Sequence, residues 1–480
     1  MLALFPVGCG ARKTIAPQDS LGSFSDDLDE RIPNLMEKYD IPGVSMALIQ
    51  DGELVWSGAY GYADVERERE MTIEAVCRAE SISKPVTAWG VMRLVEQGLL
   101  DLDAPVQEYL HDWQLPETDY GQQAVTVRGL LSNTAGMPPG SIGEEYPPES
   151  EMPTLRENLA QEARLIYEPG TAFLYSNPGF NLLELLVEDV TGREFAAYME
   201  AEILIPLGMQ EASYAWRESY QTSLPMGYEM DGTPVPPYVY PHKASGGLFA
   251  NVEDLARFVR AEMIGADQSV LDQESIHMLH NAQVEIPGLF GFVADAYGFG
   301  HFIETLPDGR KAVWHGGQGH GWMTHFHAVP ESGDGIVILT NSQRSWPFLA
   351  EVLTDWAQWS GLGAVKFGII TQATTGLKAL IVLIGLVSLW QAIRLVQGLR
   401  HGKRRFAPLS PVSLFWRILR AAVGFGILIT LVWSAAQPYL FVSSIFPGTV
   451  RWAGGSLLIL AVLIILSACF PRVDEVDKGA

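Results

Sequence analysis

Cysteine is scarce in this chain of 480 residues, where Cys9, Cys77 and Cys469 lie far apart. Such isolated cysteines give neither a disulfide framework nor a zinc site built on paired thiolates. A basic stripe interleaved with aromatic residues is also lacking, and the formal net charge is −24. Because phosphate groups would be repelled by this charge, the composition argues against nucleic acid as a partner.

Acidic residues are absent from Trp356 to Val473, although eleven Lys or Arg residues occur there. Residues 356–480 carry a net charge of +9, which leaves −33 for residues 1–355. A difference of this size indicates that the two parts of the chain belong in different environments.

The basic part contains long uncharged segments that approach the roughly 20 residues needed to span a bilayer. We predict a membrane region over 363–473, with spans at about 377–396, 418–437 and 451–470. Basic residues crowd the linker after the first span, so this linker is predicted to be cytoplasmic. The residues before the first span are then expected outside the cytoplasm, and 474–480 as a cytoplasmic tail.

Residues 1–24 are predicted to be an N-terminal tail or an incomplete signal. The apolar stretch from Leu2 to Val7 is short for a secretory signal, and no basic residue precedes it. Val7-Gly8-Cys9 is similar to the end of a bacterial lipoprotein signal, with Pro6 where such signals usually have Leu. Lipidation of Cys9 and a plain tail both stay open.

Residues 25–362 show hydrophobic periodicity typical of an α+β domain with an antiparallel sheet and helices in the middle of the chain. Helices are predicted at 25–41, 81–98, 126–132, 155–163, 178–191, 252–264 and 347–359. Strands are predicted at 44–49, 54–56, 298–305, 311–315, 322–329 and 335–341, with Asp51-Gly52 as a hairpin turn.

Ser81 and Lys84 are spaced so that a helix beginning at Ser81 places both side chains on one face. A serine hydroxyl becomes a good nucleophile when a base removes its proton, and a desolvated lysine is such a base. The pattern alone is weak, since a surface Ser one turn before a Lys is a common arrangement.

Two further stretches could complete a site. Tyr175 lies in a turn-rich passage where its phenol could exchange a proton with serine if a cation lowered its pKa. Asn177 offers a donor and an acceptor that suit a lysine and a substrate amide. The glycine-rich run from His315 to Trp322 lets a substrate backbone approach closely and could supply an oxyanion N–H.

A metal site is the rival interpretation of the histidines in and after this run. The candidate ligands would be His315, His320, His325 and His327. No carboxylate or cysteine accompanies them at diagnostic spacing, so we expect neither a metal nor another cofactor.

The order Ser81-x-x-Lys84, Tyr175-Ser176-Asn177, His315-Gly316-Gly317 resembles the serine hydrolases related to class C β-lactamases and low-molecular-weight D,D-peptidases. Three further segments are similar to parts of that family, at 126–137, 205–209 and 245–248. Within 126–137, Asn133 and Ala135 depart from the family's usual His and Ser. The resemblance spans about residues 25–345 and implies a β-lactamase/transpeptidase-like fold with an all-helical subdomain.

The resemblance also implies roles. Ser81 would form an acyl-enzyme, Lys84 and Tyr175 would manage its proton, and Asn177 would orient lysine and substrate. Substrate would also meet His315 and Gly317, with Gln318 supplying the second oxyanion N–H. His315 stands where β-lactamases carry a lysine, and a histidine is only partly cationic at pH 7. Anchoring of a β-lactam carboxylate should therefore be weaker.

These observations predict a membrane-anchored, extracytoplasmic serine hydrolase with D,D-peptidase-like or esterase-like activity on cell-wall-related amide or ester substrates. Its partners would be the membrane and a small-molecule or peptide substrate such as a peptidoglycan stem peptide or a β-lactam. The alternatives are a non-enzymatic sensor acylated by such a ligand and a weak β-lactamase.

Overall fold

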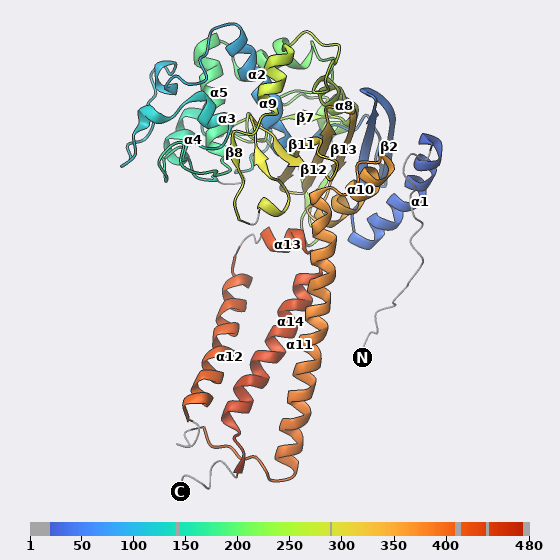
Figure 1. Cartoon of the computed structure of the whole chain (residues 1–480), viewed down its shortest axis with the longest axis vertical. Helices are drawn as coiled ribbons and strands as arrows, with labels where there is room; N and C mark the ends of the chain where they lie inside the picture. The colour runs from blue at the N-terminus through green and yellow to red at the C-terminus, as the bar shows by residue number, and fades with distance from the viewer. Residues whose placement is uncertain (1–19, 141–143, 289, 409–413, 438–440, 474–480) are drawn as a thin grey trace. The chain divides into compact units, whose positions relative to one another are not determined.

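The computed structural model describes residues 20–473 except 141–143, 289, 409–413 and 438–440 (Figure 1). The expectations for Cys9 and for the tail at 474–480 lie outside the described residues. The chain divides into two compact units between Ile369 and Ile370. We call the first the hydrolase unit and the second the helical unit.

The hydrolase unit is built on a nine-stranded antiparallel sheet with the order β3-β2-β1-β13-β12-β11-β10-β9-β8. The strands are β1 Gly43–Gln50, β2 Glu53–Asp64, β3 Arg69–Glu70, β8 Val284–Glu285, β9 Ala296–Tyr297, β10 Phe302–Thr305, β11 Lys311–Gly319, β12 Trp322–Val329 and β13 Asp334–Thr340. Four short strands lie outside it, β4 Cys77–Arg78 paired with β7 Phe249–Ala250, and β5 Gly227–Tyr228 paired with β6 Pro234–Val235. The predicted α+β fold with an antiparallel sheet is confirmed.

Segments from near the start and near the end of the hydrolase unit meet in this sheet, because β1 pairs with β13 in the register Val44↔Thr340 to Ile49↔Gly335. The hairpin from β1 to β2 turns at Asp51 and Gly52, whose φ angles of 53° and 77° are those of the predicted Asp-Gly turn. Side chains of a strand alternate between the two faces, yet β1 is buried on both. Helices must therefore cover both faces of the central strands.

The helices supply that cover and build the helical subdomain. They are α1 Leu21–Tyr39, α2 Ser83–Glu96, α3 Val127–Leu131, α4 Leu155–Glu162, α5 Asn177–Thr191, α6 Phe195–Met199, α7 Tyr220–Ser223, α8 Val252–Ala261, α9 Gln273–Leu279 and α10 Trp346–Trp359. Figure 1 shows α1 and α10 close to β2, while α2, α3, α4 and α5 gather at the other end of the sheet. Phe24 of α1 stacks on Trp359 of α10 with ring centroids 4.5 Å apart.

Three details differ from the sequence predictions. The α-helix after Ser81 begins only at Ser83, because a 3₁₀ turn at Glu80–Ile82 precedes it. β11 continues through the glycine run to Gly319 instead of ending near 315. The strand predicted at 298–305 starts at Phe302, since Gly300 has a left-handed φ of 75° that interrupts the extended backbone.

The helical unit contains α11 Ile369–Arg400, α12 Leu414–Ala435, α13 Phe441–Ile445 and α14 Thr449–Cys469. Its α11, α12 and α14 are long and apolar enough to cross a membrane. Gly424 of α12 lets this helix approach α14 closely, because a Cβ there would lie 2.6 Å from Ile465. The buried Arg417 donates its Nε–H to the Ala468 carbonyl at 2.9 Å, so its charged group is hydrogen-bonded to backbone.

Candidate active site

A locked turn presents Ser81 at the start of α2. The hydroxyl of Ser83 donates to the Glu80 carbonyl at 2.6 Å and accepts from the Leu248 N–H at 3.0 Å. Thr324 of β12 donates its hydroxyl to the Ala79 carbonyl at 2.8 Å. These bonds hold the turn from both sides, while the Ser81 side chain stays partly exposed.

Lys84 lies one turn beyond and is completely buried. Its Nζ is 3.2 Å from Ser81 Oγ, 2.8 Å from Asn177 Oδ1 and 2.8 Å from the Ser245 carbonyl. Burial holds the pKa of this amine well below its ordinary value, against the raising effect of the Glu80 charge. A neutral amine has two N–H groups for the two carbonyl-type acceptors, and its lone pair then faces the Ser81 hydroxyl. This arrangement suits a general base.

Tyr175 and Asn177 are positioned by the start of α5. Ser176 caps that helix, its Oγ accepting from the Gly179 N–H at 3.0 Å. The Ser176 N–H in turn donates to Asn133 Oδ1 at 2.9 Å. Asn133, one of the two departures from the family pattern, therefore anchors this loop.

The Tyr175 ring lies 4.7 Å from Lys84 Nζ. Burial nevertheless raises the pKa of its phenol, and the hydrogen bond with Ser81 opposes this only in part. The condition for proton exchange as a phenolate, a pKa lowered by a cation, is not met, because a buried and neutral lysine supplies little positive charge. The protonated Tyr175 is suited to donate a proton, and Lys84 is suited to accept one.

His315, Gly317 and Gln318 come from β11. The His315 Nδ1–H donates to the Gly316 carbonyl at 2.8 Å, and Nε2 lies 3.4 Å from the Tyr297 hydroxyl. Burial holds the pKa of His315 well below its usual range. His315 is thus neutral at pH 7, so its pull on a substrate carboxylate is weaker than a partly cationic histidine would give.

Glycine is required where β11 approaches the turn before Ser81. A Cβ at Gly317 would lie 2.3 Å from the Ala79 carbonyl oxygen and 2.2 Å from Thr324 Oγ1. A Cβ at Gly319 would lie 2.3 Å from the carboxyl carbon of Glu80. The close approach brings the strand edge with Gln318 to Ser81, as an oxyanion pocket between the two would need.

A buried ion pair next to Ser81 was not predicted from the sequence. Arg78 Nε lies 2.7 Å from Glu80 Oε1, and both side chains are almost fully buried. Tyr238 and Tyr240 donate hydroxyls to the Glu80 carboxylate at 3.0 and 3.2 Å. Glu80 also has a left-handed φ of 51°, a conformation that costs about 1–3 kcal/mol in a residue other than glycine. The neighbours of Ser81 therefore hold it in a strained turn.

The four histidines of the rival metal interpretation do not converge. His315 lies beside Tyr175, whereas His320 pairs with Glu145 and Glu229 at 3.1 and 3.4 Å. His325 Nε2 lies 3.4 Å from His327 Nδ1, and His327 faces Glu304 at 3.1 Å. Within the described residues these side chains form separate contacts instead of one ligand sphere.

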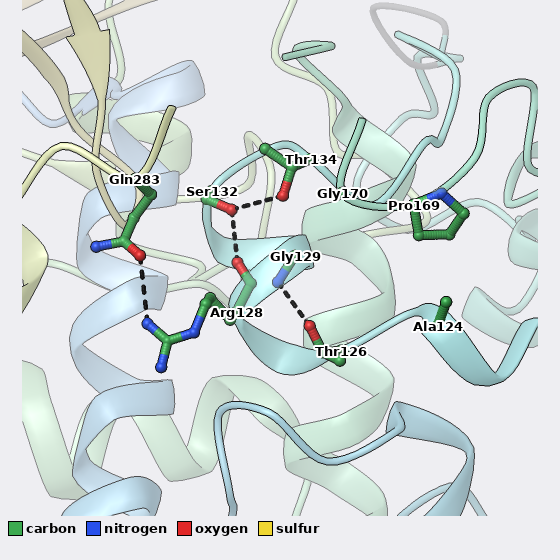
Figure 2. A pocket seen from close by; sticks show the side chains of 9 residues that line it. All are labelled: Ala124, Thr126, Arg128, Gly129, Ser132, Thr134, Pro169, Gly170 and Gln283. Carbon is green, nitrogen blue, oxygen red and sulfur yellow. Dashed lines mark hydrogen bonds between the residues drawn. The ribbon is translucent and has the colours of Figure 1, made fainter. Parts of the chain in front are cut away.

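A separate cavity of about 180 Å³ opens near α3 (Figure 2). Its lining includes Arg128, Ser132, Thr134 and Gln283, and none of the predicted site residues. Arg128 is held by two bonds to Asp103, at 2.7 and 2.9 Å. The chemistry gathers around Ser81 and not in this cavity.

Sequence comparisons place the chain among known proteins. Protein flp of Staphylococcus aureus (strain N315) is 24% identical over 438 residues, covering 87% of this chain and 83% of flp. The matched 87% of the chain is more than the hydrolase unit, residues 1–369, contains. The match therefore extends into the helical unit. Esterase EstB of Burkholderia gladioli is 26% identical over 374 residues, covering 67% of this chain and 91% of the esterase.

Solved structures give the same result. The octameric penicillin-binding protein homologue from Pyrococcus abyssi superposes with a TM-score of 0.59 at 29% identity, covering 68% of this chain and 77% of that one. SurE with D-Leu gives a TM-score of 0.58 at 25% identity, covering 72% and 77%. The family model described as Beta-lactamase matches residues 28–356, which include Ser81, Lys84, Tyr175 and His315. The chain is a member of the β-lactamase family and has the fold of that family's serine hydrolases.

Proposed function

We propose that this protein is a membrane-anchored serine hydrolase that forms an acyl-enzyme on Ser81. The observation that carries the proposal is the environment of Lys84, whose buried amine contacts Ser81, Asn177 and a backbone carbonyl. An apolar Met or Leu would fill this buried position better than a neutral lysine if packing were the only requirement. An amine kept within 3.2 Å of a serine hydroxyl therefore indicates a chemical role.

The proposed reaction follows from these positions. Ser81 Oγ attacks the substrate carbonyl while Lys84 Nζ takes its proton, and the oxyanion meets the backbone N–H groups of Ser81 and Gln318. The bond to the leaving group then breaks, and the leaving nitrogen or oxygen takes a proton delivered through Tyr175 from Lys84. Water finally attacks the ester carbonyl of the acyl-enzyme, releasing the acid and restoring Ser81. Asn177 orients Lys84 and the substrate amide throughout.

The proposed substrates are uncharged acyl compounds such as esters, with peptides ending in D-amino acids as a second class. A neutral His315 gives little electrostatic anchoring to the carboxylate of a β-lactam or of a peptide C-terminus, so both should be slower substrates than an uncharged ester. Support comes from the relatives, since one is named an esterase and one solved neighbour contains D-Leu. The active unit would face the cell wall if the basic linker of the helical unit is cytoplasmic.

Purified full-length protein in detergent tests the activity. Wild type, Ser81→Ala and Lys84→Ala are compared on a short-chain ester, a D-alanyl-D-alanine peptide and a chromogenic β-lactam. We expect turnover by wild type alone, with the ester faster than the peptide and the β-lactam, which both carry a carboxylate. Equal rates in wild type and Ser81→Ala would overturn the proposal.

A second candidate is a sensor that is acylated and stays trapped. It is favoured by the helical unit, because anchoring an enzyme needs one span and three helices here are long enough to cross a membrane. The two functions differ in turnover. A sensor would release one equivalent of leaving group per chain and then stop, whereas the enzyme would continue.

A further inference from the structure

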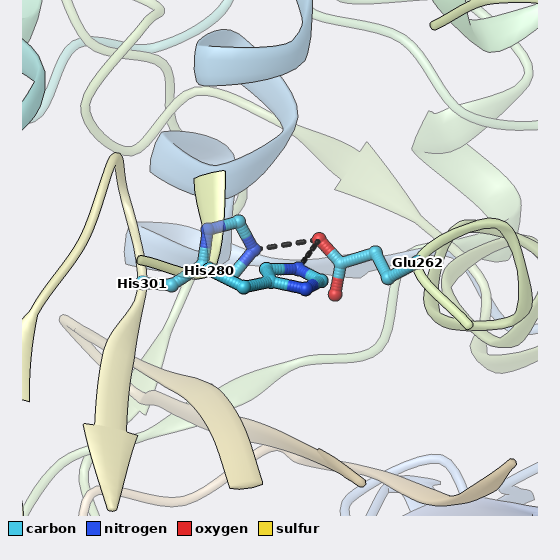
Figure 3. Close-up of side chains that lie close together, drawn as sticks. All are labelled: Glu262, His280 and His301. Atoms are coloured by element: carbon cyan, nitrogen blue, oxygen red, sulfur yellow. Dashed lines mark hydrogen bonds and ion pairs between the residues drawn. The ribbon is translucent and has the colours of Figure 1, made fainter. Parts of the chain in front are cut away.

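A second cluster of chemically capable side chains lies in the hydrolase unit, on elements that do not carry Ser81. Glu262 follows α8, His280 follows α9 and His301 precedes β10 (Figure 3). One nitrogen or oxygen atom of each lies within 4.8 Å of the other two. Figure 3 shows both imidazole rings directed at the same carboxylate. Glu262 and His301 are fully buried, and the His280 side chain is 11% exposed.

Donor and acceptor positions show that a cation belongs between His301 and Glu262. His301 Nδ1 lies 2.8 Å from the Phe299 carbonyl, which only accepts, so Nδ1 carries a hydrogen. A neutral His301 then presents the lone pair of Nε2, which lies 2.6 Å from Glu262 Oε1. Two acceptors do not approach this closely unless a proton or a metal ion lies between them.

A proton would leave other atoms of the cluster unsatisfied. Glu262 Oε2 and His280 Nε2 are buried and have no hydrogen-bond partner among the described residues. His280 Nε2 lies 3.9 Å from Glu262 Oε1, too far for a hydrogen bond. Buried polar atoms are rarely left unpaired, and two in one cluster indicate a missing ligand.

We propose that Glu262, His280 and His301 bind a divalent transition metal of the zinc class. Two imidazole nitrogens and a carboxylate form a ligand set that zinc accepts. The bond from His301 Nδ1–H to a backbone carbonyl is the outer contact that usually orients a ligating histidine. Binding requires His301 Nε2 and Glu262 Oε1 to separate slightly, so that each lies about 2.0–2.2 Å from the ion.

The position of the site assigns it a structural role. The residue before His301, Gly300, packs so closely on α2 that a Cβ there would lie 3.0 Å from the Lys84 carbonyl oxygen. The Phe299 N–H donates to the Leu279 carbonyl at 3.0 Å, next to His280. A metal ion would therefore join α8, α9 and the start of β10 behind the helix that carries Lys84, without touching substrate.

Metal content tests the proposal on the full chain. Purified protein is stripped with a chelator, reloaded with Zn²⁺ or Co²⁺, desalted and measured by plasma mass spectrometry. We expect about one ion per chain, visible absorption bands of bound Co²⁺ and a higher melting temperature with metal. Less than about 0.1 ion per chain, with no change in melting temperature, would show that a proton fills the gap and would overturn the proposal.

Matched variants locate the ion. Glu262→Gln and His301→Gln should weaken Co²⁺ binding at least about 10–100-fold, the loss expected even for outer contacts of a metal site. His277→Gln, on the exposed face of α9, should bind as wild type does. Unchanged binding in a folded Glu262→Gln variant would contradict the assignment. If both variants fail to fold, the Co²⁺ spectrum and melting curve of wild type decide.

Discussion

The two units of this chain differ in which side chains they bury and which they expose. The hydrolase unit encloses charged side chains, and Arg78, Glu80 and Lys84 are each at most 2% exposed. The helical unit instead exposes apolar ones, including Ile429 at 69%, Val432 at 70% and Trp416 at 61%. The two units therefore differ in the side chains that suit their surfaces. Hydrocarbon around the helical unit would make exposed apolar groups favourable there.

The largest effect concerns Lys84, the proposed base. Lys84→Met keeps the volume and removes the amine, so acylation should fall at least about a thousandfold, as for Ser81→Ala. Stopped-flow kinetics with an activated ester measure this, while thermal unfolding checks the fold. Because a neutral apolar residue suits the interior, stability should be equal or higher. A variant that keeps more than a tenth of the rate would show that Lys84 is not the base.

The ion pair beside the nucleophile should dominate stability. Glu80→Gln leaves Arg78 as an uncompensated buried charge, and we expect a loss of about 3–5 kcal/mol in the free energy of unfolding. Adding Arg78→Met should recover much of that loss, because both charges are then gone. A double-mutant cycle in urea measures the coupling. Additive losses in the double variant would contradict the pairing.

A charge introduced on the exposed surface of the helical unit should be costly, whereas one on the exposed surface of the hydrolase unit should not. Leu386 lies at the middle of α11 and is 60% exposed. Its substitution by Arg should cost about 2.5–3.5 kcal/mol in the free energy of membrane insertion. Leu99 is 49% exposed in the hydrolase unit, and its change to Arg should alter the free energy of unfolding by less than about 0.5 kcal/mol. Glycosylation mapping in microsomes and urea unfolding give the two values. Equal tolerance at both positions would remove the contrast.

Protonation of Lys84 should give a pH dependence of about tenfold per unit. Since burial lowers the pKa of this amine, it is neutral above that lowered value, and acylation is lost as pH falls through it. The unfolded chain binds more protons between the lowered pKa and the ordinary value, so stability rises with pH over that window. Lys84→Arg stays cationic and should show no rising limb. A flat profile in wild type would contradict a neutral base.

The sequence predicted the fold and most of the site, because both depend on local signals. Hydrophobic periodicity located α1, α5 and the β1–β2 hairpin, and three ordered motifs located Ser81, Lys84 and Tyr175. The environment of these residues depends on distant contacts, and local patterns do not report it. Tyr175 and His315 lie against each other and against Phe302, and burial shifts the pKa of both. The Arg78–Glu80 pair likewise depends on the distant Tyr238 and Tyr240.

The most direct test of the central claim is the mass of the intact chain after reaction. Full-length protein that is incubated with a fluorophosphonate, or quenched during turnover of an activated ester, should gain one adduct, on the peptide containing Ser81. Ser81→Ala should gain none. An adduct on another residue, or no adduct in folded wild-type protein, would contradict the claim that Ser81 is the nucleophile.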